Sequence, residues 1–401
     1  MNNQQVRRIV IAGAGQAGAS AALALRRAGF DGDITLVGDE PHVPYERPQL
    51  SKEMLRPGDA TLRPMRTADD YARDGIGLRL GRKVARVEAG ARRVKLDDGQ
   101  WLDYDRLLIA TGVRPRRIAG LTDPTRVRHL RNVEDAIALR QDIVDGCALA
   151  IVGGGVIGLE VAAAARPRGN TVVIVEAADR LMSRCVDPVI SRFLDRRHRA
   201  EGSDIRYGVQ AQSFDGTNLA LSDGSTIAAD RVLVGVGVVP NSEAFDALGI
   251  GDGIGIRVDH QGRTAIDGIY ATGDIASQPG AHDYGRVETW ANAQGHAAAV
   301  AQNLLGADAE CAVPMWFWSD QGSTNLQVLD DAPGGDVVMR GDPEGDVFSA
   351  FRLNGDACVV ACSAVNSPKD MAMARRWLAQ RQRLDPTRLA DAAIPLRDCL
   401  A

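Results

Sequence analysis

The stretch that decides the fold runs from Ile9 to Gly18 and reads Ile-Val-Ile-Ala-Gly-Ala-Gly-Gln-Ala-Gly. Its first four residues are apolar and predict a short buried strand. The next six match G-x-G-x-x-G, and the small residues that follow predict a helix. A second apolar run at 34–37 predicts the next strand. This order of strand, glycine turn and helix is the one that a dinucleotide-binding unit requires.

The same pattern returns further along the chain. Residues 149–152 predict a strand, residues 153–158 read Gly-Gly-Gly-Val-Ile-Gly, and a helix and a strand at 172–175 follow. Gly13 and Gly153 are 140 positions apart. In such turns the first glycine permits a tight turn, the second lets the backbone approach a pyrophosphate, and the third lets helix and strand pack closely. We therefore expect two dinucleotide-binding units.

The acidic residues after the second strand of each unit differ. Glu176 directly follows its strand, where a carboxylate accepts hydrogen bonds from ribose hydroxyls and repels a 2′-phosphate, which favours NADH over NADPH. Arg180, four residues on, could instead serve a phosphate. In the first unit the same position is Gly38 and the acid comes one residue later, so Asp39 is the ribose candidate there.

The remaining pattern predicts the domain organisation. Buried strands at 107–112 and 232–238 flank the second unit, so we expect it to be inserted into the first domain. After residue 312 the chain predicts alternating strands, then helices that open at Ser367 and Asp385. The expected fold is α/β, with two Rossmann-like domains, the second inserted in the first, plus a C-terminal α+β domain. The expected domains are 1–113 with 235–311, 114–234, and 312–401.

Composition excludes several classes of protein. The 401 residues carry 52 acids and 47 bases, so no broad positive field exists for nucleic acid or a membrane surface. The six cysteines form no C-x-x-C pair, and we expect no zinc site or iron–sulfur cluster. The two most apolar stretches are interrupted by the glycine turns, so we expect no membrane segment and a cytoplasmic protein.

Three further segments have two interpretations each. The loop at 42–52 is either a surface turn or places Arg47 and Lys52 against a phosphate or a flavin edge. Asp274 is the last residue of the run Ile-Tyr-Ala-Thr-Gly-Asp, which predicts a strand followed by a helix start. Its carboxylate either caps that helix or accepts a hydrogen bond from a ligand hydroxyl. The aromatic run at 316–318 is either a core cluster or a lid over a cofactor.

Together these motifs make the chain resemble a known family over essentially its whole length. The motifs are GAGQAG, LVGDEPHVPYERPQLSK, LLIATG, IVGGGVIGLE, YATGD, RVETWANAQ and WFWSDQ. The chain is similar to the FAD-dependent NADH:ferredoxin reductases of bacterial aromatic-ring dioxygenases and cytochrome P450 systems, which are relatives of the glutathione reductase fold. The likeness is greatest to reductase components for biphenyl, toluene and arylpropionate dioxygenases.

The resemblance implies roles for individual positions. It implies that Lys52 lies near the flavin N5 and pairs with Glu160, and these two are the expected catalytic residues. The other residues that it matches to the FAD site are Gly13, Gly15, Ala17, Gly18, Asp39, Val84, Arg131, Asp274 and Trp290. Arg47, the candidate from the loop at 42–52, is added to this expected FAD site. The residues that it matches to the NADH site are Gly153, Gly155, Gly158 and Glu176. Two departures are Gln49, where the family often has proline, and Pro167, late in the second helix.

The distribution of cysteine suggests the route of the electrons. Many members of the wider fold pass electrons from flavin to cysteine beside it, but residues 1–146 contain no cysteine. We therefore expect the electrons to pass directly to an acceptor outside the chain. The resemblance implies hydride transfer from NADH to FAD and single-electron transfer to a [2Fe–2S] ferredoxin of Rieske type. The arginines at 375, 376, 381, 383 and 388 either dock that partner or form a solvated face. The alternatives are a reductase for a P450 ferredoxin or rubredoxin, an NADH oxidase, and a binding protein resembling apoptosis-inducing factor.

Overall fold

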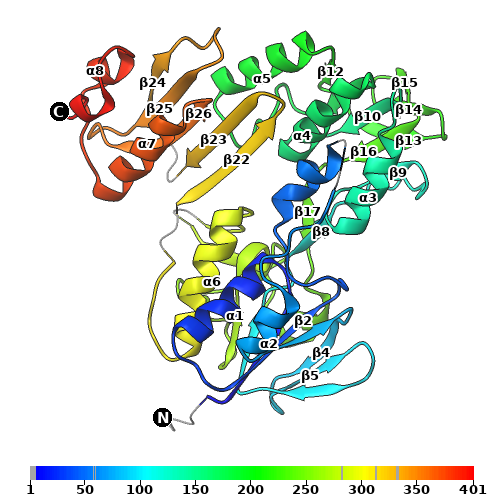
Figure 1. The fold of residues 1–401 in the computed structure, drawn as a ribbon, viewed down its shortest axis with the longest axis vertical. Helices are drawn as coiled ribbons and strands as arrows, with labels where there is room; N and C mark the ends of the chain where they lie inside the picture. The colour runs from blue at the N-terminus through cyan, green and yellow to red at the C-terminus, as the bar shows by residue number, and fades with distance from the viewer. Residues whose placement is uncertain (1–5, 57, 59, 281–282, 312–313, 331–333) are drawn as a thin grey trace. The chain divides into compact units, whose positions relative to one another are not determined.

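A computed structural model describes residues 6–56, 58, 60–280, 283–311, 314–330 and 334–401. The chain forms two compact units (Figure 1). Unit 1 consists of residues 1–47, 62–114 and 238–315, and unit 2 of residues 48–61, 115–237 and 316–401. The expected start of the C-terminal domain, residue 312, lies outside the described residues. The three-domain division stays a prediction.

Unit 1 is built on a parallel sheet with the strand order β19-β7-β1-β2-β3. Its strands are Ile269–Ala271 (β19), Arg106–Ile109 (β7), Arg8–Ala12 (β1), Asp33–Gly38 (β2) and Ile76–Leu80 (β3). The register aligns Ala12 with Val37 and with Ile109, so these strands end at one edge of the sheet. Parallel strands are buried on both faces, which explains why residues 9–12 of β1 are an unbroken apolar run.

Alternate residues of β1 face two separate cores of unit 1. Ile9 and Ile11 pack with the helices α1 and α6, which lie side by side in Figure 1. Val10 and Ala12 pack with a small antiparallel sheet on the other face. The helices span Gln16–Arg27 (α1), Ala68–Arg73 (α2) and Trp290–Leu304 (α6). The small sheet consists of Val84–Glu88 (β4), Arg93–Leu96 (β5) and Trp101–Asp103 (β6), and the shorter strands of the unit are Ile256–Arg257 (β18), Ala276–Pro279 (β20) and Tyr284–Gly285 (β21).

Unit 2 repeats the same parallel arrangement in the order β12-β11-β10-β16-β9. Its strands are Asp204–Tyr207 (β12), Thr171–Glu176 (β11), Ala148–Val152 (β10), Arg231–Val234 (β16) and Val127–Arg128 (β9). Its helices are Val133–Asp142 (α3), Val156–Ala165 (α4) and Pro188–Ala200 (α5), and a small sheet is formed by Ala211–Phe214 (β13), Asn218–Leu221 (β14) and Thr226–Ala228 (β15). The first strand of each repeat is central and its second strand lies beside it, which confirms the two Rossmann-like units.

The last part of unit 2 is a five-stranded sheet in the order β22-β23-β26-β25-β24, covered by two helices. Its elements are Met315–Gln321 (β22), Thr324–Asp330 (β23), Asp336–Gly341 (β24), Phe348–Leu353 (β25), Val359–Val365 (β26), Pro368–Gln380 (α7) and Pro386–Ala390 (α8). Ser367 and Asp385 are the N-cap residues of the two helices, as the sequence predicts. The α/β fold with a further α+β part is confirmed.

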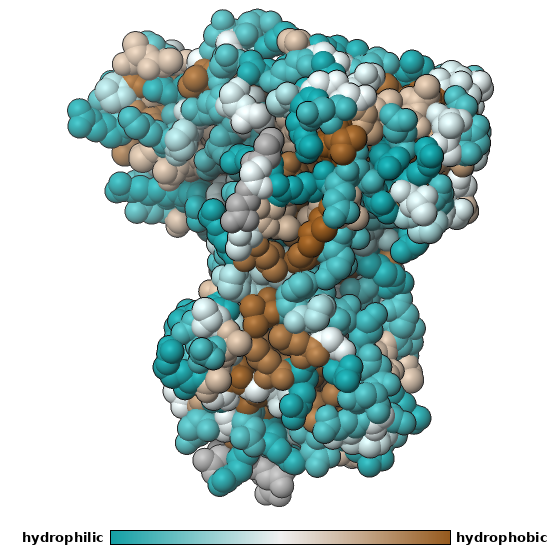
Figure 2. Space-filling view, turned by 45° about the vertical axis from the view of Figure 1, so that its right-hand side comes forward, coloured by the Kyte–Doolittle hydropathy of each residue, from teal (hydrophilic) through white to brown (hydrophobic). Residues whose placement is uncertain are grey.

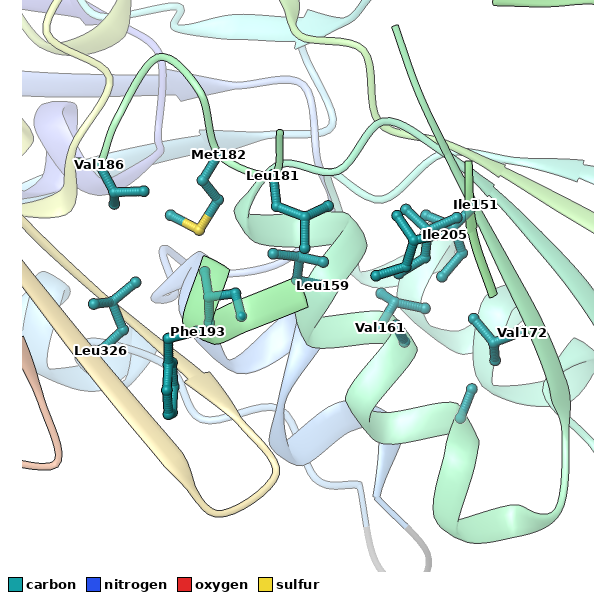
Figure 3. Close-up of a cluster of buried hydrophobic side chains, with 14 of the residues drawn as sticks. Ile151, Leu159, Val161, Val172, Leu181, Met182, Val186, Phe193, Ile205 and Leu326 are labelled. Carbon is teal, nitrogen blue, oxygen red and sulfur yellow. The ribbon is translucent and has the colours of Figure 1, made fainter. Parts of the chain in front are cut away.

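One apolar core joins the nucleotide-binding sheet of unit 2 to this last sheet. Leu159 on α4, Phe193 on α5 and Leu326 on β23 lie in it, with Ile151 on β10 (Figure 3). Burying such side chains stabilises by roughly 1.5–3 kcal/mol each. The side chains of α4, α5 and the neighbouring strands are therefore held in fixed positions within unit 2.

Local predictions differ from the structure at two places. The expected strand at 232–238 is wrong, because β16 ends at Val234. Gly235 and Gly237, whose φ is +96°, separate it from a second strand, Val238–Pro240 (β17). β17 pairs with Val113–Pro115 (β8). Asp274 does not start an α-helix but lies in a short 3₁₀ turn, Gly273–Ile275, before β20. At Pro167, where the sequence left the length of the helix open, α4 has already ended, and the proline lies in a 3₁₀ turn after it.

Hydrophilic residues cover most of the surface seen in Figure 2. Among the described residues, no helix has the length and apolarity needed to cross a membrane.

Candidate functional site

The first glycine turn is built by close backbone packing. Gly13 has φ +120°, and a Cβ there would lie 2.1 Å from the carbonyl oxygen of Ala110. A Cβ at Gly18 would lie 1.8 Å from the carbonyl oxygen of Gly13. Both positions therefore require glycine for the fold itself. Gly15 does not, because its nearest neighbour, the Arg47 guanidinium, is 4.0 Å from the Cβ position.

The second turn repeats this geometry. Gly153 has φ +110°, and a Cβ there would lie 2.4 Å from the carbonyl oxygen of Gly235. A Cβ at Gly158 would lie 2.3 Å from the Gly153 oxygen, whereas one at Gly155 would meet no atom within 4 Å. The open space at the middle glycines, at the N-terminal ends of α1 and α4, fits a bound pyrophosphate.

The carboxylate of Glu176 is held against the second turn. One oxygen accepts from the Gly154 amide at 2.7 Å and the other from the Ala178 amide at 2.7 Å. The alternative phosphate ligand, Arg180, donates to the carbonyl oxygens of Ser183 and Val186 at 2.8 and 3.0 Å. Its guanidinium is therefore engaged within its own loop, which favours a ribose without a 2′-phosphate at Glu176.

The first unit has no room for an acid at the matching position. A Cβ at Gly38 would lie 2.4 Å from the Cβ of Ala14 in the glycine turn. In unit 2 the small and the large residue exchange places. The turn there has Gly154 where unit 1 has Ala14, and this leaves room for Glu176 where unit 1 has Gly38. Asp39 is exposed, with Lys83 3.9 Å away, and stays a predicted ribose ligand.

Arg47 is part of a charged cluster in unit 1. It donates to Glu40 at 2.7 Å, and Tyr45 also donates to that carboxylate. Burial lowers the pKa of Arg47, but the charges of Tyr45, Glu40 and Asp274 outweigh it and raise the pKa above its ordinary value. Arg47 therefore stays a cation, which suits a ligand of a phosphate group.

Lys52 and Glu160 form a buried ion pair in unit 2. Their Nζ and Oε1 atoms are 2.7 Å apart, with 9% and 1% of the two side chains exposed. The sequence resemblance implied this pair, and the structure brings the two residues together. Lys52 also lies 5.9 Å from the centre of the Trp318 ring, within range of a cation–π contact.

Sequence reasoning missed three further donors to Glu160. Ser51 donates to one carboxylate oxygen, while Ser319 donates to the other at 2.8 Å and the Asp320 amide at 3.3 Å. Serine is common in turns and strands, so only the position of Ser51 beside Lys52 and of Ser319 after the tryptophans could have drawn attention to them.

The other expected FAD residues lie in both units. Asp274 is in the 3₁₀ turn after β19, Trp290 is the first residue of α6, and Val84 begins β4, all in unit 1. Arg131 is in unit 2, just before α3. Ala17 is buried in the first turn of α1. The roles of these residues stay predictions.

Among the described residues, no three His, Cys, Asp or Glu side chains are grouped to hold a metal ion.

Two nucleotide-binding sheets, each with an open glycine turn, and a buried lysine–glutamate pair define a two-dinucleotide oxidoreductase. The family model for pyridine nucleotide-disulphide oxidoreductases matches residues 7–297, and a reductase C-terminal model matches residues 316–400. The chain belongs to the pyridine nucleotide-disulphide oxidoreductase family, and its cofactors are FAD and NAD(H).

Individual relatives match almost the whole chain. It is 57% identical to the ferredoxin–NAD(+) reductase component of the p-cumate 2,3-dioxygenase system of Pseudomonas putida, over 99% of both chains. It is 40% identical to the corresponding component of the anthranilate 1,2-dioxygenase system of Burkholderia cepacia, over 98% of both. Its structure is similar to the crystal structure of a covalent putidaredoxin reductase–putidaredoxin complex, with a TM-score of 0.92, 34% identity, and 99% and 98% of the chains covered.

We expect Gly155→Ser to leave the fold intact and to weaken NADH binding. Gly155 is the N-cap of α4 with φ −87°, and serine is a good N-cap residue. Its side chain would occupy the space that a pyrophosphate needs. The KM for NADH should rise about tenfold, or ~1.4 kcal/mol, with an unchanged Tm. Gly355→Ser, at another open position of unit 2, is the control. An unchanged KM would contradict this assignment of the NADH site.

Proposed function

We propose that this chain is an FAD-containing ferredoxin–NAD(+) reductase that takes hydride from NADH and passes electrons singly to a [2Fe–2S] ferredoxin of an aromatic-ring dioxygenase. The similarity to two dioxygenase reductase components over nearly their full length supports it. The proposed partner is a Rieske-type ferredoxin, and the proposed location is the cytoplasm, where NADH is supplied.

The observation that carries the proposal is the placement of cysteine relative to the first nucleotide turn. The first cysteine of the chain is Cys147, and unit 1, which holds that turn, contains only Cys311. Unit 1 therefore has no pair of thiols that could form a redox disulfide within it. This favours an acceptor outside the chain for the electrons that arrive from NADH.

The buried pair assists the transfer of hydride electrostatically. When bound, FAD supplies the capacity to accept a hydride and release its electrons one at a time. The Lys52 ammonium stabilises the negative charge that the hydride brings, and Glu160 holds this ammonium in place. A fixed charge in a site with little water stabilises a developing charge more strongly than it would in bulk water.

The main test is cytochrome c reduction by NADH with and without an added [2Fe–2S] ferredoxin. A strong dependence on ferredoxin supports the proposal. Rapid consumption of oxygen without ferredoxin would indicate the oxidase instead. The likeness to putidaredoxin reductase favours one second candidate, a reductase whose ferredoxin serves a different oxygenase. Comparing putidaredoxin with a Rieske-type ferredoxin as the acceptor separates these two.

The arginine surface around α7 is the proposed docking site for the ferredoxin. It consists of Arg375, Arg376, Arg381, Arg383 and Arg388, all exposed. Within the described residues, none of the five has an ion-pair partner. An acidic protein would therefore meet exposed guanidinium groups that are not already paired with a carboxylate.

Reversing two of these charges should slow the reduction of ferredoxin selectively. We expect Arg381→Glu with Arg383→Glu to lower kcat/KM for ferredoxin about tenfold at low salt, because surface charges act chiefly on association. NADH-dependent reduction of a small dye should not change. Arg27→Glu with Arg192→Glu alters the net charge equally at exposed positions elsewhere and is the control. Equal effects of the two double variants would contradict docking at α7.

A further inference from the structure

A line of buried polar side chains continues from Glu160 into the interior of unit 2. Ser319 Oγ donates to Glu160 Oε1 at 2.8 Å, and Gln321 Nε2 donates to Ser319 Oγ at 3.0 Å. Gln321 Oε1 lies 2.8 Å from Nε2 of His198. All four side chains belong to residues that are at most 2% exposed. We name Ser319, Gln321 and His198 the buried relay.

The relay allows only one arrangement of protons. The Glu160 carboxylate can only accept, so the Ser319 hydroxyl proton points to it and the Ser319 oxygen must accept from the Gln321 amide nitrogen. The Gln321 oxygen then faces His198 and requires a proton on Nε2 of that ring. No hydrogen-bond partner of His198 Nδ1 lies among the described residues. Burial also lowers the pKa of His198, so the neutral ring with its proton on Nε2 is favoured.

The strand and helices fix the relay in space. Ser319 and Gln321 are two positions apart on β22, so their side chains point to the same face of the strand. Glu160 follows the core residue Leu159 on α4, and His198 is on the same helix as the core residue Phe193 (Figure 3). Glu160 and His198, which contact the two ends of the hydrogen-bonded line, are thus on helices held by a packed core, and movement of the Glu160 carboxylate would break the sequence of hydrogen bonds.

We propose that Ser319, Gln321 and His198 are positioning residues, which set the orientation of the Glu160 carboxylate and through it the location of the Lys52 ammonium. Lys52 reaches Glu160 Oε1, the same oxygen that accepts from Ser319. Loss of the Ser319 hydroxyl leaves that oxygen with Lys52 and the longer bond from the Asp320 amide, and loss of the Gln321 amide leaves the Ser319 hydroxyl less well oriented. In either case the carboxylate is held less firmly, and the ammonium moves with it. The inference rests on the proposed role of Lys52 in hydride transfer.

The test compares the single-turnover rate of flavin bleaching by NADH in Ser319→Ala, Gln321→Met and the wild type. We expect this rate to fall about tenfold in both variants, within the range for residues in one hydrogen-bond network, with an unchanged KM for NADH. Ser319→Thr keeps the hydroxyl and should recover most of the rate. Ser349→Ala is the matched control, because Ser349 is equally buried in the last sheet and donates to a carboxylate, Asp370, at 2.8 Å.

A merely structural role is excluded by repeating the substitutions with Lys52→Met. If the relay acts through Lys52, Gln321→Met should change the bleaching rate by less than about twofold in that background. A full tenfold fall there, or equal falls in Ser319→Ala and Ser349→Ala, would overturn the inference. A normal rate in Lys52→Met would overturn the role of Lys52 itself. A lowered rate in Lys52→Met together with a normal rate in Ser319→Ala would overturn the relay alone.

Discussion

Acidification is expected to remove about 3 kcal/mol from the free energy of unfolding through one residue, His296, as the pH falls from ~6.5 to ~4. This histidine lies on α6 in unit 1 and is 1% exposed. Burial lowers its pKa from 6.5 to about 4. No hydrogen-bond partner of its Nδ1 atom lies within the described residues. The folded protein thus surrounds the ring without stabilising its charged form.

The sign of the effect follows from proton binding. Below a pH of about 6.5 the unfolded chain binds a proton at this histidine, whereas the folded chain does so only near pH 4. The unfolded state therefore gains stability with every step of acidification across this window. The pKa of His129 and that of His198 are also lowered by burial, so acid acts in the same direction on unit 2.

Urea unfolding at pH ~7.5 and ~5 measures the effect. Substituting His296→Leu removes the titrating group, so the wild type should lose about 2 kcal/mol more than the variant between these two pH values. The volume is similar, and the variant should fold at neutral pH. His260→Gln, an exposed change in unit 1, leaves His296 in place and is the control. Equal pH dependence of His296→Leu and the wild type would contradict the prediction.

The sequence was sufficient for features that rest on local backbone requirements. Gly13 and Gly18 have no space for a Cβ, and Gly153 and Gly158 repeat this, so the glycines alone indicated both nucleotide-binding units. Helix starts were also local, because Ser367 precedes a proline that begins the helix. The prediction of a helix at Asp274 was wrong, although a strand followed by Thr-Gly-Asp commonly leads into a helix. Only the pairing of β20 with neighbouring strands shows that another strand follows.

The surroundings of Glu160 could not be predicted in the same way. The relay joins residue 160 to residue 319 and, through Gln321, to His198. Such contacts depend on which strand lies beside which helix, and no local pattern encodes that. A buried serine or glutamine has no distinctive sequence signal, whereas its hydrogen bonds show its role as soon as the packing is known.

Removing the cation beside Glu160 should have the largest effect on the rate of hydride transfer. We expect Lys52→Met to lower the single-turnover rate of flavin bleaching by NADH about 100-fold, or ~2.7 kcal/mol, as for other fixed donors that act on developing charge. Methionine keeps most of the length and apolar contact of the lysine chain. Three donors to the Glu160 carboxylate remain, so the variant should fold.

Two comparisons separate this electrostatic effect from loss of packing. Lys52→Arg retains a cation near Glu160 and should recover part of the rate, while Lys369→Met removes an exposed lysine on α7 and should leave the bleaching rate unchanged. Glu160→Gln keeps the shape but not the charge, and it should slow the reaction less than Lys52→Met does, because the ammonium is still present although less well held. A wild-type rate in Lys52→Met, with flavin bound in normal amount, would show that the pair only stabilises the fold and that the charge brought by the hydride is stabilised by other groups.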